Sequence, residues 1–313
     1  MKKTIVVIGS SNTDMIIKTE HIPKPGETVL GGAFSTAPGG KGANQAVSAA
    51  RAGGNVLFIA RVGDDMFGTQ AVEGFVRDGI TIDSIITDKN APSGVALIFV
   101  DETGENSIAV ASGANARLSI SDIEASEETI ASAGIVLMQL EIPLETVRAA
   151  AEIAGENGVN IILNPAPAQP LGDDILRHIS ILTPNESEAE LLTGIKVTDE
   201  HGAAQAAEAL SANGVKTVLI TLGSQGVYAA SPEFHGIIPG FRVQAVDTTA
   251  AGDVFNGVLA VSLSEHMPLI EAVRFSNAAA ALSVTTLGAQ PSAPYREEIE
   301  DFLKKVLATD EHG

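Results

Sequence analysis

The chain has 313 residues, of which 39 are acidic and 19 are basic, so its formal net charge at neutral pH is −20. A surface with this charge repels nucleic-acid phosphates and anionic membranes, and neither is expected as a partner. An anionic ligand must therefore be held by a local device, such as backbone amides, a helix N-terminus or a metal ion. The sequence contains no cysteine, which excludes disulfides and thiol nucleophiles and fits a reducing, cytoplasmic compartment.

Short apolar runs alternate with alanine-rich amphipathic stretches along most of the chain, a pattern typical of helices packed on a parallel sheet. The first run, Thr4–Ile8, is too short for the core of a secretion signal and is predicted to be a buried strand. Further strands are predicted at Val56–Ala60, Ile135–Leu140, Asn160–Leu163, Ile179–Leu182 and Thr217–Thr221. Helices are predicted at Ala43–Ala52, Pro143–Asn157, Ala203–Asn213, Ala251 to about Glu265, Leu269 to about Thr285, and Tyr295–Leu307. The predicted fold class is therefore α/β with a mostly parallel central sheet, and residues 1–313 are expected to form one domain.

Two segments break this alternation. Residues 14–36 contain Pro23, Pro25 and several glycines, and residues 93–111 have the pattern of a hairpin that turns at Asp101–Gly104. Both are predicted to form strands outside the main sheet. They would build a small β lid over the ligand crevice from two pieces that are distant in the chain, and a lid excludes water from a reaction. The pattern is equally consistent with an alternative, a hairpin at the edge of the sheet that has no role in ligand binding.

The strongest local signal is the segment Asp247–Asp253, whose small residues lead directly into a long apolar helix. Small residues allow backbone amides to approach a ligand, and the positive end of the helix dipole adds to their field, so the segment is typical of an anion hole. Asp253 would place a carboxylate beside this hole, where it can accept a proton from an attacking hydroxyl. An ordinary acidic residue in the first turn of a helix is the alternative, and the pattern taken alone favours it.

Three further polar clusters precede or follow predicted elements. Pro38–Asn44 is a glycine-rich loop that enters a helix; it is not a Walker A loop, and a tight turn is its alternative interpretation. Asn12 and Asp14 follow the first strand, where open α/β sheets bind ligands, and they would clamp vicinal hydroxyls unless they only form an Asx turn. Glu141 directly follows the strand predicted at Ile135–Leu140, so it could also bind a ligand at the end of a strand. Its alternative interpretation is an acidic residue at the start of the next helix.

Two more segments point to a nucleotide. Asn185–Glu188 opens a helix after the strand Ile179–Leu182, and its acids would suit a hydrated Mg²⁺ or would simply cap the helix. Thr221–Gly226 is a strand end followed by a glycine-rich turn, which fits nucleotide phosphates and fits a hairpin equally well. The six histidines have no metal-ligand spacing, and the sequence has no Gly-x-Ser-x-Gly elbow, which leaves serine hydrolase chemistry without support.

The order and number of these motifs resemble the ribokinase-like carbohydrate kinases, the PfkB family, over essentially the whole chain. Gly39–Ala46 is similar to the first signature of that family, Asp247–Asp253 with residues 255–257 is similar to the second, and Asn185–Glu188 matches its Asn-x-x-Glu motif. Residues 137–141, 164–168 and 239–248 add to the resemblance. It implies a three-layer αβα sandwich with a small β-sheet lid. It also implies ATP-dependent phosphorylation of a sugar at its primary 5-hydroxyl, with D-ribose as the expected acceptor.

The resemblance implies a role for each matching residue. The sugar would be bound by Asn12, Asp14, Gly40, Lys41, Asn44, Glu141 and Asp253, of which Asp253 would also be the catalytic base. The anion hole would be formed by Ala250, Ala251, Gly252 and the amide of Asp253. ATP would be contacted by Asn185, Thr221, Gly223, Ser224, Gly226, Gly252 and Asn277. Glu188 would help to place Mg²⁺ through water, and K⁺ would be held by Asp247, Thr249, Ser283, Thr286, Gly288 and Ser292.

The chain departs from the family at two positions. Ala250 stands where many members have glycine, and Asn277 stands where close relatives often have histidine.

A homodimer through the lid is expected. Deoxyribose, fructose or adenosine remain alternative acceptors, although an amide at Asn12 favours a sugar with a 2-hydroxyl. A non-catalytic sugar or nucleotide sensor is an alternative of another class, and a dinucleotide-dependent oxidoreductase lacks its Gly-x-Gly-x-x-Gly turn.

Overall fold

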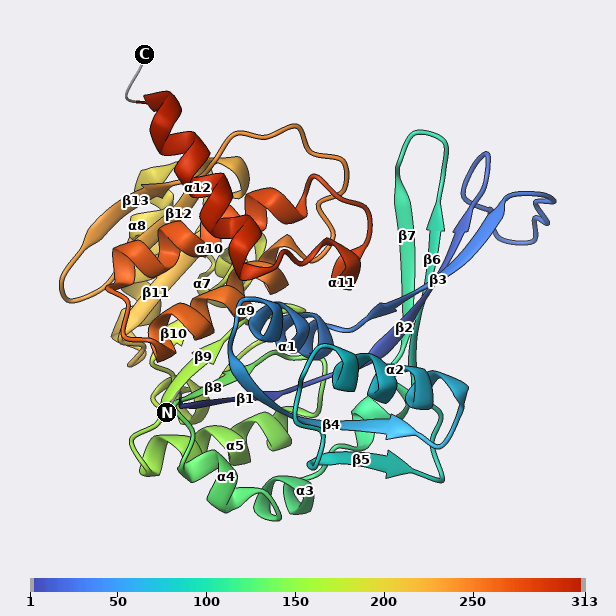
Figure 1. The fold of residues 1–313 in the computed structure, drawn as a ribbon, viewed down its shortest axis with the longest axis horizontal. Helices are drawn as coiled ribbons and strands as arrows, with labels where there is room; N and C mark the ends of the chain where they lie inside the picture. The colour runs from blue at the N-terminus through green and yellow to red at the C-terminus, as the bar shows by residue number, and fades with distance from the viewer. Residues whose placement is uncertain (1–2, 311–313) are drawn as a thin grey trace.

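The computed structural model describes residues 3–310 and contains two separate β-sheets (Figure 1). The larger sheet has nine strands in the order β13-β12-β11-β10-β9-β8-β1-β4-β5. From β11 to β5 every neighbouring pair is parallel, whereas β12 pairs antiparallel with both β11 and β13. Its strands are β1 (Thr4–Ile8), β4 (Asn55–Gly63), β5 (Ile85–Asp88), β8 (Ile135–Met138), β9 (Asn160–Leu163), β10 (Ile181–Leu182), β11 (Thr217–Thr221), β12 (Gly226–Ala230) and β13 (His235–Pro239). The predicted mostly parallel central sheet is confirmed.

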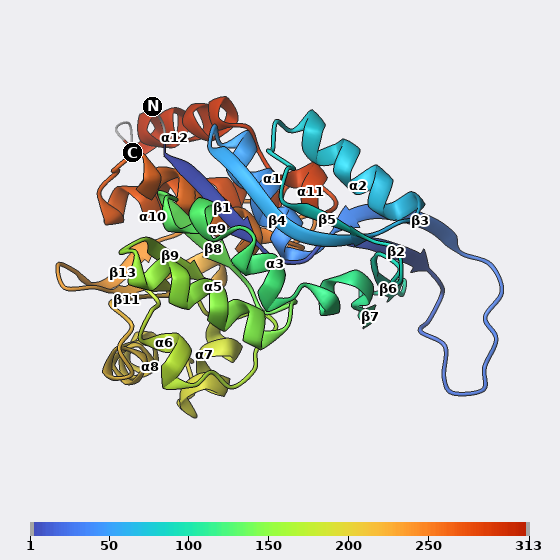
Figure 2. The same ribbon diagram turned by 90° about the horizontal axis from the view of Figure 1, so that it is seen from below.

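Helices cover both faces of this sheet, as Figures 1 and 2 show. One layer contains α1 (Lys41–Arg51), α2 (Met66–Arg77), α9 (Ala251–Ser264), α10 (Leu269–Ser283) and α12 (Arg296–Asp310). The other contains α3 (Ile120–Glu124), α4 (Glu127–Ala131), α5 (Leu144–Glu156), α6 (Asp173–Leu176), α7 (Glu186–Thr193) and α8 (Glu200–Ala212). Strand β1 shows why its sequence is apolar throughout. Ile5 and Val7 pack into the first layer and Val6 and Ile8 into the second, so a strand between two helical layers needs apolar residues at every position. The three-layer αβα arrangement is confirmed.

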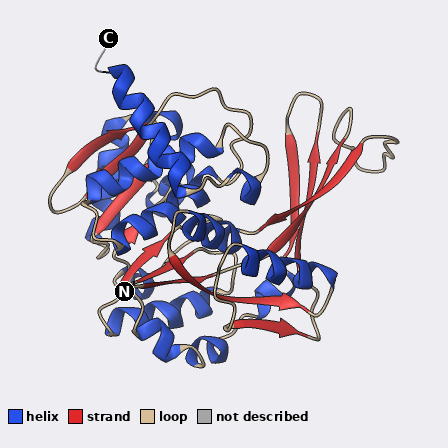
Figure 3. Cartoon of the chain, in the orientation of Figure 1, coloured by secondary structure: helices blue, strands red, loops and turns tan. Residues whose placement is uncertain are grey.

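The smaller sheet has four strands in the order β3-β2-β6-β7. They are β2 (Asn12–Lys18), β3 (Ala33–Gly39), β6 (Gly94–Val100) and β7 (Asn106–Ala111). The sheet therefore joins the two chain-distant segments that the sequence singles out, although β2–β3 pairing begins at Asn12 and Gly39, outside the predicted limits of 14 and 36. Because β2 follows directly after β1, the small sheet stands at the C-terminal end of β1 and projects away from the helical layers (Figures 1, 2 and 3).

Several elements differ from the sequence prediction. The predicted strand at Ile179–Leu182 contributes only Ile181–Leu182 to the sheet, because Ile179 still closes the turn after α6 through a bond from its N–H to Leu176 O (3.0 Å). Strand β8 ends at Met138, two residues before the predicted Leu140. Strands β5 and β13 and helix α2 are not predicted, and β12 is predicted only by the hairpin alternative at Thr221–Gly226. No helix among residues 3–310 is long and apolar enough to cross a membrane.

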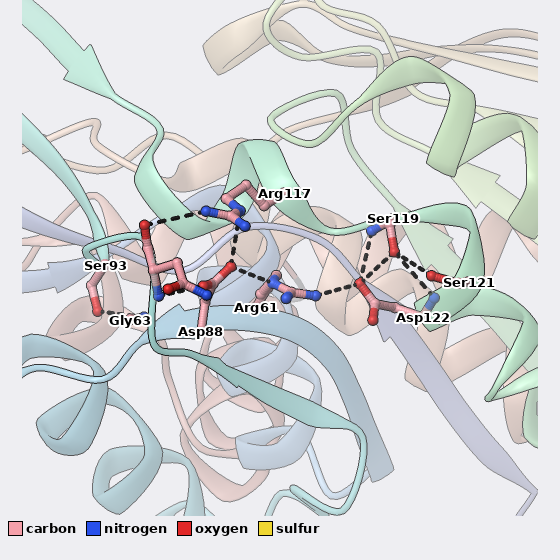
Figure 4. A network of polar contacts seen from close by, with 9 residues as sticks. Arg61, Gly63, Asp88, Ser93, Arg117, Ser119, Ser121 and Asp122 are labelled. Atoms are coloured by element: carbon pink, nitrogen blue, oxygen red, sulfur yellow. Dashed lines mark hydrogen bonds and ion pairs between the residues drawn. The ribbon is translucent and has the colours of Figure 1, made fainter.

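A polar network connects strands β4 and β5, at one edge of the central sheet, to the segment that follows β7 of the small sheet (Figure 4). Asp88, at the end of β5, accepts from Arg61 Nε at 2.8 Å and forms an ion pair with Arg117 Nε at 3.1 Å. Arg61 also reaches Asp122 of α3 at 2.8 Å. Arg117 ends the short 3-10 helix η1 (Gly113–Arg117), so the network fixes η1 against β4 and β5. Asn115, in the middle of η1, is thereby held next to the root of the small sheet.

Candidate active site

A pocket of about 170 Å³ opens where α9 begins, at the C-terminal edge of the central sheet. It lies at the edge where open α/β sheets bind ligands, since the loops that follow parallel strands meet there. Most of its lining was singled out from the sequence. The lining residues are Lys41, Asn164, Ala166, Thr183, Asn185, Glu188, Thr221, Thr248, Ala250, Ala251, Gly252, Asp253 and Asn256.

Asp253 lies in the first turn of α9 and is only 5% exposed. Each of its carboxylate oxygens accepts an amide hydrogen bond at 2.9 Å, Oδ2 from Asn44 Nδ2 and Oδ1 from Gln45 Nε2. Burial raises the pKa of Asp253, and the charge of Lys41 and the two amides oppose this rise. The structure therefore holds a buried, oriented carboxylate at the pocket wall, which is the arrangement that a general base requires.

The backbone before Asp253 forms the expected concavity. The N–H groups of Gly252 and Asp253 make no hydrogen bond with a described residue, whereas Ala251 N–H donates to Thr248 O at 3.3 Å. A Cβ added at Gly252 would meet nothing within 4 Å outside the backbone of its own helix, so the space beside this residue is open. Ala250 has a φ of 60°, the left-handed conformation, which costs a residue with a Cβ about 1–2 kcal/mol. That conformation explains why glycine would suit this position.

Lys41 begins α1 and lines the same pocket. Burial lowers the pKa of Lys41, but the carboxylates of Asp253, Glu141 and Glu188 outweigh this effect and raise it above its ordinary value. The ammonium group is therefore a permanent positive charge among three carboxylates. It offsets part of the negative charge that a protein with this composition would otherwise present to an anionic ligand.

A second group of predicted residues faces the root of the small sheet. Glu141 accepts from Ser10 Oγ at 2.5 Å and from Lys41 N–H at 3.0 Å, which fixes its carboxylate beside the start of α1. Asp14 of β2 lies near Glu141 and Asp253. Burial is the largest cause that raises the pKa of Asp14, and the negative charges of Glu141 and Asp253 add to it, so the pKa rises from 3.8 to about 6. A Cβ at Gly39 would come within 2.5 Å of the Asp14 carboxylate, so the backbone at the end of β3 passes directly over this group.

Asn12 and Gly40 complete this side of the site. Gly40 precedes α1 with a φ of 89°, and a Cβ there would lie 2.7 Å from Asn12 N. Asn12 is 7% exposed, and its Oδ1 accepts from Asn115 Nδ2 at 2.7 Å. The same oxygen lies against Gly94, where a Cβ would be 2.1 Å from it, and the NH₂ group of Asn12, which has no bond to a described residue, is the part that remains available to a ligand. A pocket of about 390 Å³ is lined by Asn12, Asn115 and Glu141 among others.

Asn115 has no role in the sequence prediction. It is 1% exposed, and besides its bond to Asn12 its Oδ1 accepts from Ser11 N at 2.9 Å. No spacing or local motif distinguishes this asparagine in the sequence, because it becomes part of the site only through the packing of η1. Gln45 and Asn164 lie within segments that resemble the family, but the resemblance implies a role for neither.

The expected nucleotide residues lie on the opposite side of Asp253. Asn185 and Glu188 form a reciprocal capping box at the start of α7, with bonds of 2.9 and 2.8 Å, so the alternative interpretation as a helix cap is confirmed. Both residues nevertheless line the pocket. Burial raises the pKa of Glu188 even though the Asn185 backbone and Lys41 oppose this.

The remaining expected nucleotide contacts surround the β11–β12 connection. This connection is a hairpin: β11 and β12 pair antiparallel, and the 3-10 turn η2 (Gly223–Gln225) joins them, with Gly226 already in β12. Thr221 lines the pocket, whereas Gly223 and Ser224 lie in the exposed turn. Asn277 of α10 is 7% exposed and donates to Pro239 O at 3.2 Å, which places it under the end of β13.

Asp247 joins two loops near the start of α9. Its Oδ1 accepts from Thr249 N at 2.9 Å and from Thr249 Oγ1 at 2.6 Å, and its Oδ2 accepts from Gly288 N at 2.9 Å. Burial tends to raise the pKa of Asp247, but these bonds lower it overall. Ser283 and Ser292 are buried and donate to Ala280 O and Ala289 O, and Thr286 N donates to Ser283 O at 3.1 Å. The structure therefore brings Asp247, Thr249 and Gly288 together.

The described residues contain no group of three or more acidic or histidine side chains that could hold a metal ion. Glu188 is the carboxylate that faces the pocket from the side of the expected nucleotide. A single carboxylate suits Mg²⁺, which keeps several waters and binds substrate phosphates. For a monovalent cation the donor set is the oxygen-rich loop around Asp247. Both sets fit the expected ions chemically.

Comparison with known proteins gives one consistent result. The model of the pfkB family carbohydrate kinases matches residues 2–296. A ribokinase of Haemophilus influenzae is 49% identical over 304 residues, which cover 97% of this chain and 99% of that protein. The crystal structure of a ribokinase from Thermotoga maritima superimposes with a TM-score of 0.89 at 43% identity and covers 96% of this chain and 99% of its own. The structure of Arabidopsis thaliana ribokinase complexed with ribose and ATP has a TM-score of 0.89 at 36% identity, with 97% and 99% coverage.

The fold and the site define a phosphotransferase-type α/β enzyme with its pocket at the start of α9. The chain belongs to the pfkB family of carbohydrate kinases.

Proposed function

We propose that the protein transfers the γ-phosphoryl group of ATP to the 5-hydroxyl of D-ribose, giving D-ribose 5-phosphate and ADP. The observation that carries the proposal is the buried Asp253 carboxylate next to the open N–H groups of Gly252 and Asp253 in one pocket. The similarity to the Haemophilus influenzae ribokinase and to the ribose- and ATP-bound Arabidopsis thaliana protein supports the choice of sugar and of phosphoryl donor.

In this mechanism Asp253 accepts the proton of the 5-hydroxyl as the oxygen attacks the γ-phosphorus. Negative charge then develops on the equatorial phosphoryl oxygens, and the free N–H groups at the start of α9, with the helix dipole, stabilise it. The ammonium of Lys41, held near Asp253 and Glu188, adds a positive charge on the same side of the site. The protein supplies positioning and electrostatic stabilisation, which is what phosphoryl transfer requires.

The sugar would lie between the pocket at α9 and the root of the small sheet. The carboxylates of Asp14 and Glu141 accept bonds from sugar hydroxyls, while the free NH₂ group of Asn12 and the ammonium of Lys41 donate to hydroxyl oxygens. Asn44 Oδ1 is buried without a hydrogen-bond partner among the described residues, which fits an acceptor kept for a ligand hydroxyl. The backbone of Gly40 closes this side.

ATP would lie on the other side of Asp253, along the start of α7 and the β11–β12 turn. Asn185 and Thr221 line the pocket there, and Gly223, Ser224, Gly226 and Asn277 would contact the nucleotide further out. Glu188 would hold Mg²⁺ through water, and the ion would neutralise charge on the β- and γ-phosphates. Glu188, which caps α7, would thus also be the residue that holds the metal ion.

A monovalent cation, K⁺, would sit beside the anion hole and strengthen its field. Asp247 and Thr249 would supply oxygen ligands from the segment before α9. Ser283, Thr286, Gly288 and Ser292 would supply the rest from the loop after α10. The existing bonds from Thr249 and Gly288 to Asp247 support this grouping, because they already draw both segments to one carboxylate.

The four-stranded sheet would act as the lid of the sugar site, with Asn12 and Asp14 on β2 as its binding residues. Its outer strand β7 is exposed along its whole length, and Ile108 and Val110 in this strand are 55% and 53% exposed. Exposed apolar residues on a sheet edge are typical of an interaction surface. We infer a homodimer through this sheet, and we place the enzyme in the cytoplasm, where ATP is available.

The test is ADP release from Mg-ATP in potassium buffer with D-ribose, 2-deoxyribose, fructose or adenosine as acceptor. A strong preference for ribose supports the proposal, and a preference for another acceptor keeps the mechanism but corrects the substrate. The matched control is Asp253→Asn, which keeps the shape of the side chain and should lose almost all turnover while still binding ribose. No turnover with any acceptor by folded wild-type protein would contradict the enzymatic proposal.

A further inference from the structure

We propose that Gln45 is a positioning residue for the general base: its side-chain amide, held in one orientation by Gln139, fixes the carboxylate of Asp253. The inference rests on the proposed role of Asp253 in phosphoryl transfer. Both glutamines are 0% exposed, and neither lines the pocket. They can therefore influence the reaction only through the groups to which they are bonded.

The hydrogen bonds define the orientation of the Gln45 amide. Its Nε2 donates to Asp253 Oδ1 at 2.9 Å and to Asn164 Oδ1 at 3.1 Å, and both partners are oxygens that accept. Its Oε1 accepts from Gln139 Nε2 at 2.6 Å. Rotating the amide by 180° would turn its oxygen toward two other oxygens and its NH₂ group toward the Gln139 NH₂ group. The network therefore permits one orientation of Gln45.

Gln139 holds Gln45 in this orientation, and its own side-chain oxygen is left without a hydrogen bond from the described part of the chain. Its Oε1 is buried and accepts no hydrogen bond from a described residue, which is unfavourable in a protein interior. Gly9 lies directly against this oxygen, since a Cβ at that position would be 2.0 Å from it. The opposite orientation of Gln139 would place its oxygen against Gln45 Oε1. The unpartnered acceptor is thus the consequence of directing the Gln139 NH₂ group at Gln45.

The surroundings of Asp253 show what Gln45 contributes. Lys41 of α1 faces Asp253 with a positive charge, and Glu141, Asp14 of β2 and Glu188 of α7 contribute negative charge. Burial raises the pKa of Asp253, and the hydrogen bond from Gln45 is one of the interactions that oppose this. Losing that donor should therefore favour the protonated, inactive form of the base and leave its carboxylate free to rotate.

The first experiment compares wild-type protein with Gln45→Met and Gln139→Met, which keep side-chain length and remove the amides. In Gln45→Met the acid limb of the pH profile of kcat should move to higher pH, and kcat on that limb should fall roughly tenfold. KM for ribose and for ATP should stay within about twofold. Thr146→Val, which removes a buried hydroxyl bonded to Leu118 O in the opposite helical layer, controls for general destabilisation and should leave the profile unchanged.

The double variant tests whether Gln139 acts through Gln45. In the Gln45→Met background, Gln139→Met should cause no further change in the profile, because the group that it orients is gone. If the two substitutions instead lowered kcat by independent factors that multiply in the double variant, Gln139 would not act through Gln45. An unmoved acid limb in Gln45→Met would overturn the proposal as a whole. If Gln45→Met does not fold, Gln139→Met alone should move the limb in the same direction by a smaller amount, and an unmoved limb there overturns it.

A readout without turnover separates this inference from the proposed function. The Asp253 carboxyl can be titrated by carbon-13 NMR, with its signal assigned by its absence in Asp253→Asn. An upward shift of its titration in Gln45→Met supports the positioning role even if ribose proves not to be the substrate. An unchanged titration refutes the positioning role even if ribose phosphorylation is confirmed.

Discussion

Asp14 is a group whose charge destabilises the free protein and whose proposed role is to bind sugar. Its carboxylate lies on β2 without a hydrogen-bond partner among the described residues, and burial, Glu141 and Asp253 raise its pKa from 3.8 to about 6. Asp14→Asn keeps the shape and removes the charge. We therefore expect the variant to be more stable than wild type at pH 7 and to bind ribose poorly, as is common for residues whose role is functional.

The magnitude follows from the two pKa values. The folded-state value of about 6 lies about 2.2 above the ordinary 3.8, which corresponds to at most about 3 kcal/mol at pH 7. Because Asp14 remains partly in contact with solvent, we expect a gain of about 1–3 kcal/mol. Below pH 3.8 the carboxyl is protonated in both the folded and the unfolded state, so the gain should vanish there. It should grow between pH 3.8 and 6 and be complete above pH 6.

Urea unfolding of both proteins at pH 4, 5, 6 and 7 measures this difference, and steady-state kinetics measure KM for ribose. Loss of an ionised acceptor should raise KM at least tenfold. The sugar-free protein must be used for unfolding, since bound sugar would stabilise the wild type. A gain that is equal at pH 4 and pH 7, or no gain at pH 7, would refute the electrostatic explanation. An unchanged KM would remove Asp14 from the sugar site.

Three further predictions concern other parts of the site. Asn115→Ala removes the donor that orients Asn12, so KM for ribose should rise about fivefold with kcat largely kept; steady-state kinetics would contradict this if kcat fell instead. Replacing K⁺ by Na⁺ should lower kcat, and Asp247→Ala should make kcat insensitive to the cation; a flat response of the wild type would discard the cation site. Ile108→Lys in β7 should shift a dimer to monomer in analytical ultracentrifugation, and an unchanged mass would exclude this strand from the interface.

The parts of the fold that the sequence predicts are those with a strong local period. Strand β1 was predicted residue by residue because Thr4–Ile8 is apolar on both faces, and α9 and α10 were predicted within about two residues of their ends. Strand β13 was missed, and β12 was predicted only by the hairpin alternative at Thr221–Gly226, because both strands extend the sheet antiparallel, at an edge where the alternation of strand and helix ends. Their position depends on pairing with β11, which is not a local property.

The small sheet shows the same limit. Its two segments could be recognised because they interrupt the alternation of strands and helices. Their union in one small lid could also be inferred, but which strands pair could not, since β2 and β6 run parallel and are separated by more than seventy residues in the chain. The exposed apolar face of β7 likewise becomes visible only when the sheet is assembled.

In the active site the sequence by itself determined the chemical groups: the acid at Asp253, the small residues before it and the lysine at Lys41. It also determined the family, because the motifs recur in one order along the chain. Only the tertiary structure decided how these groups are oriented. Asn115 fixes Asn12 across 103 positions, and Gln45 reaches Asp253 across 208. Hydrogen-bond geometry depends on distances of a few ångströms between elements, and no local pattern encodes these distances.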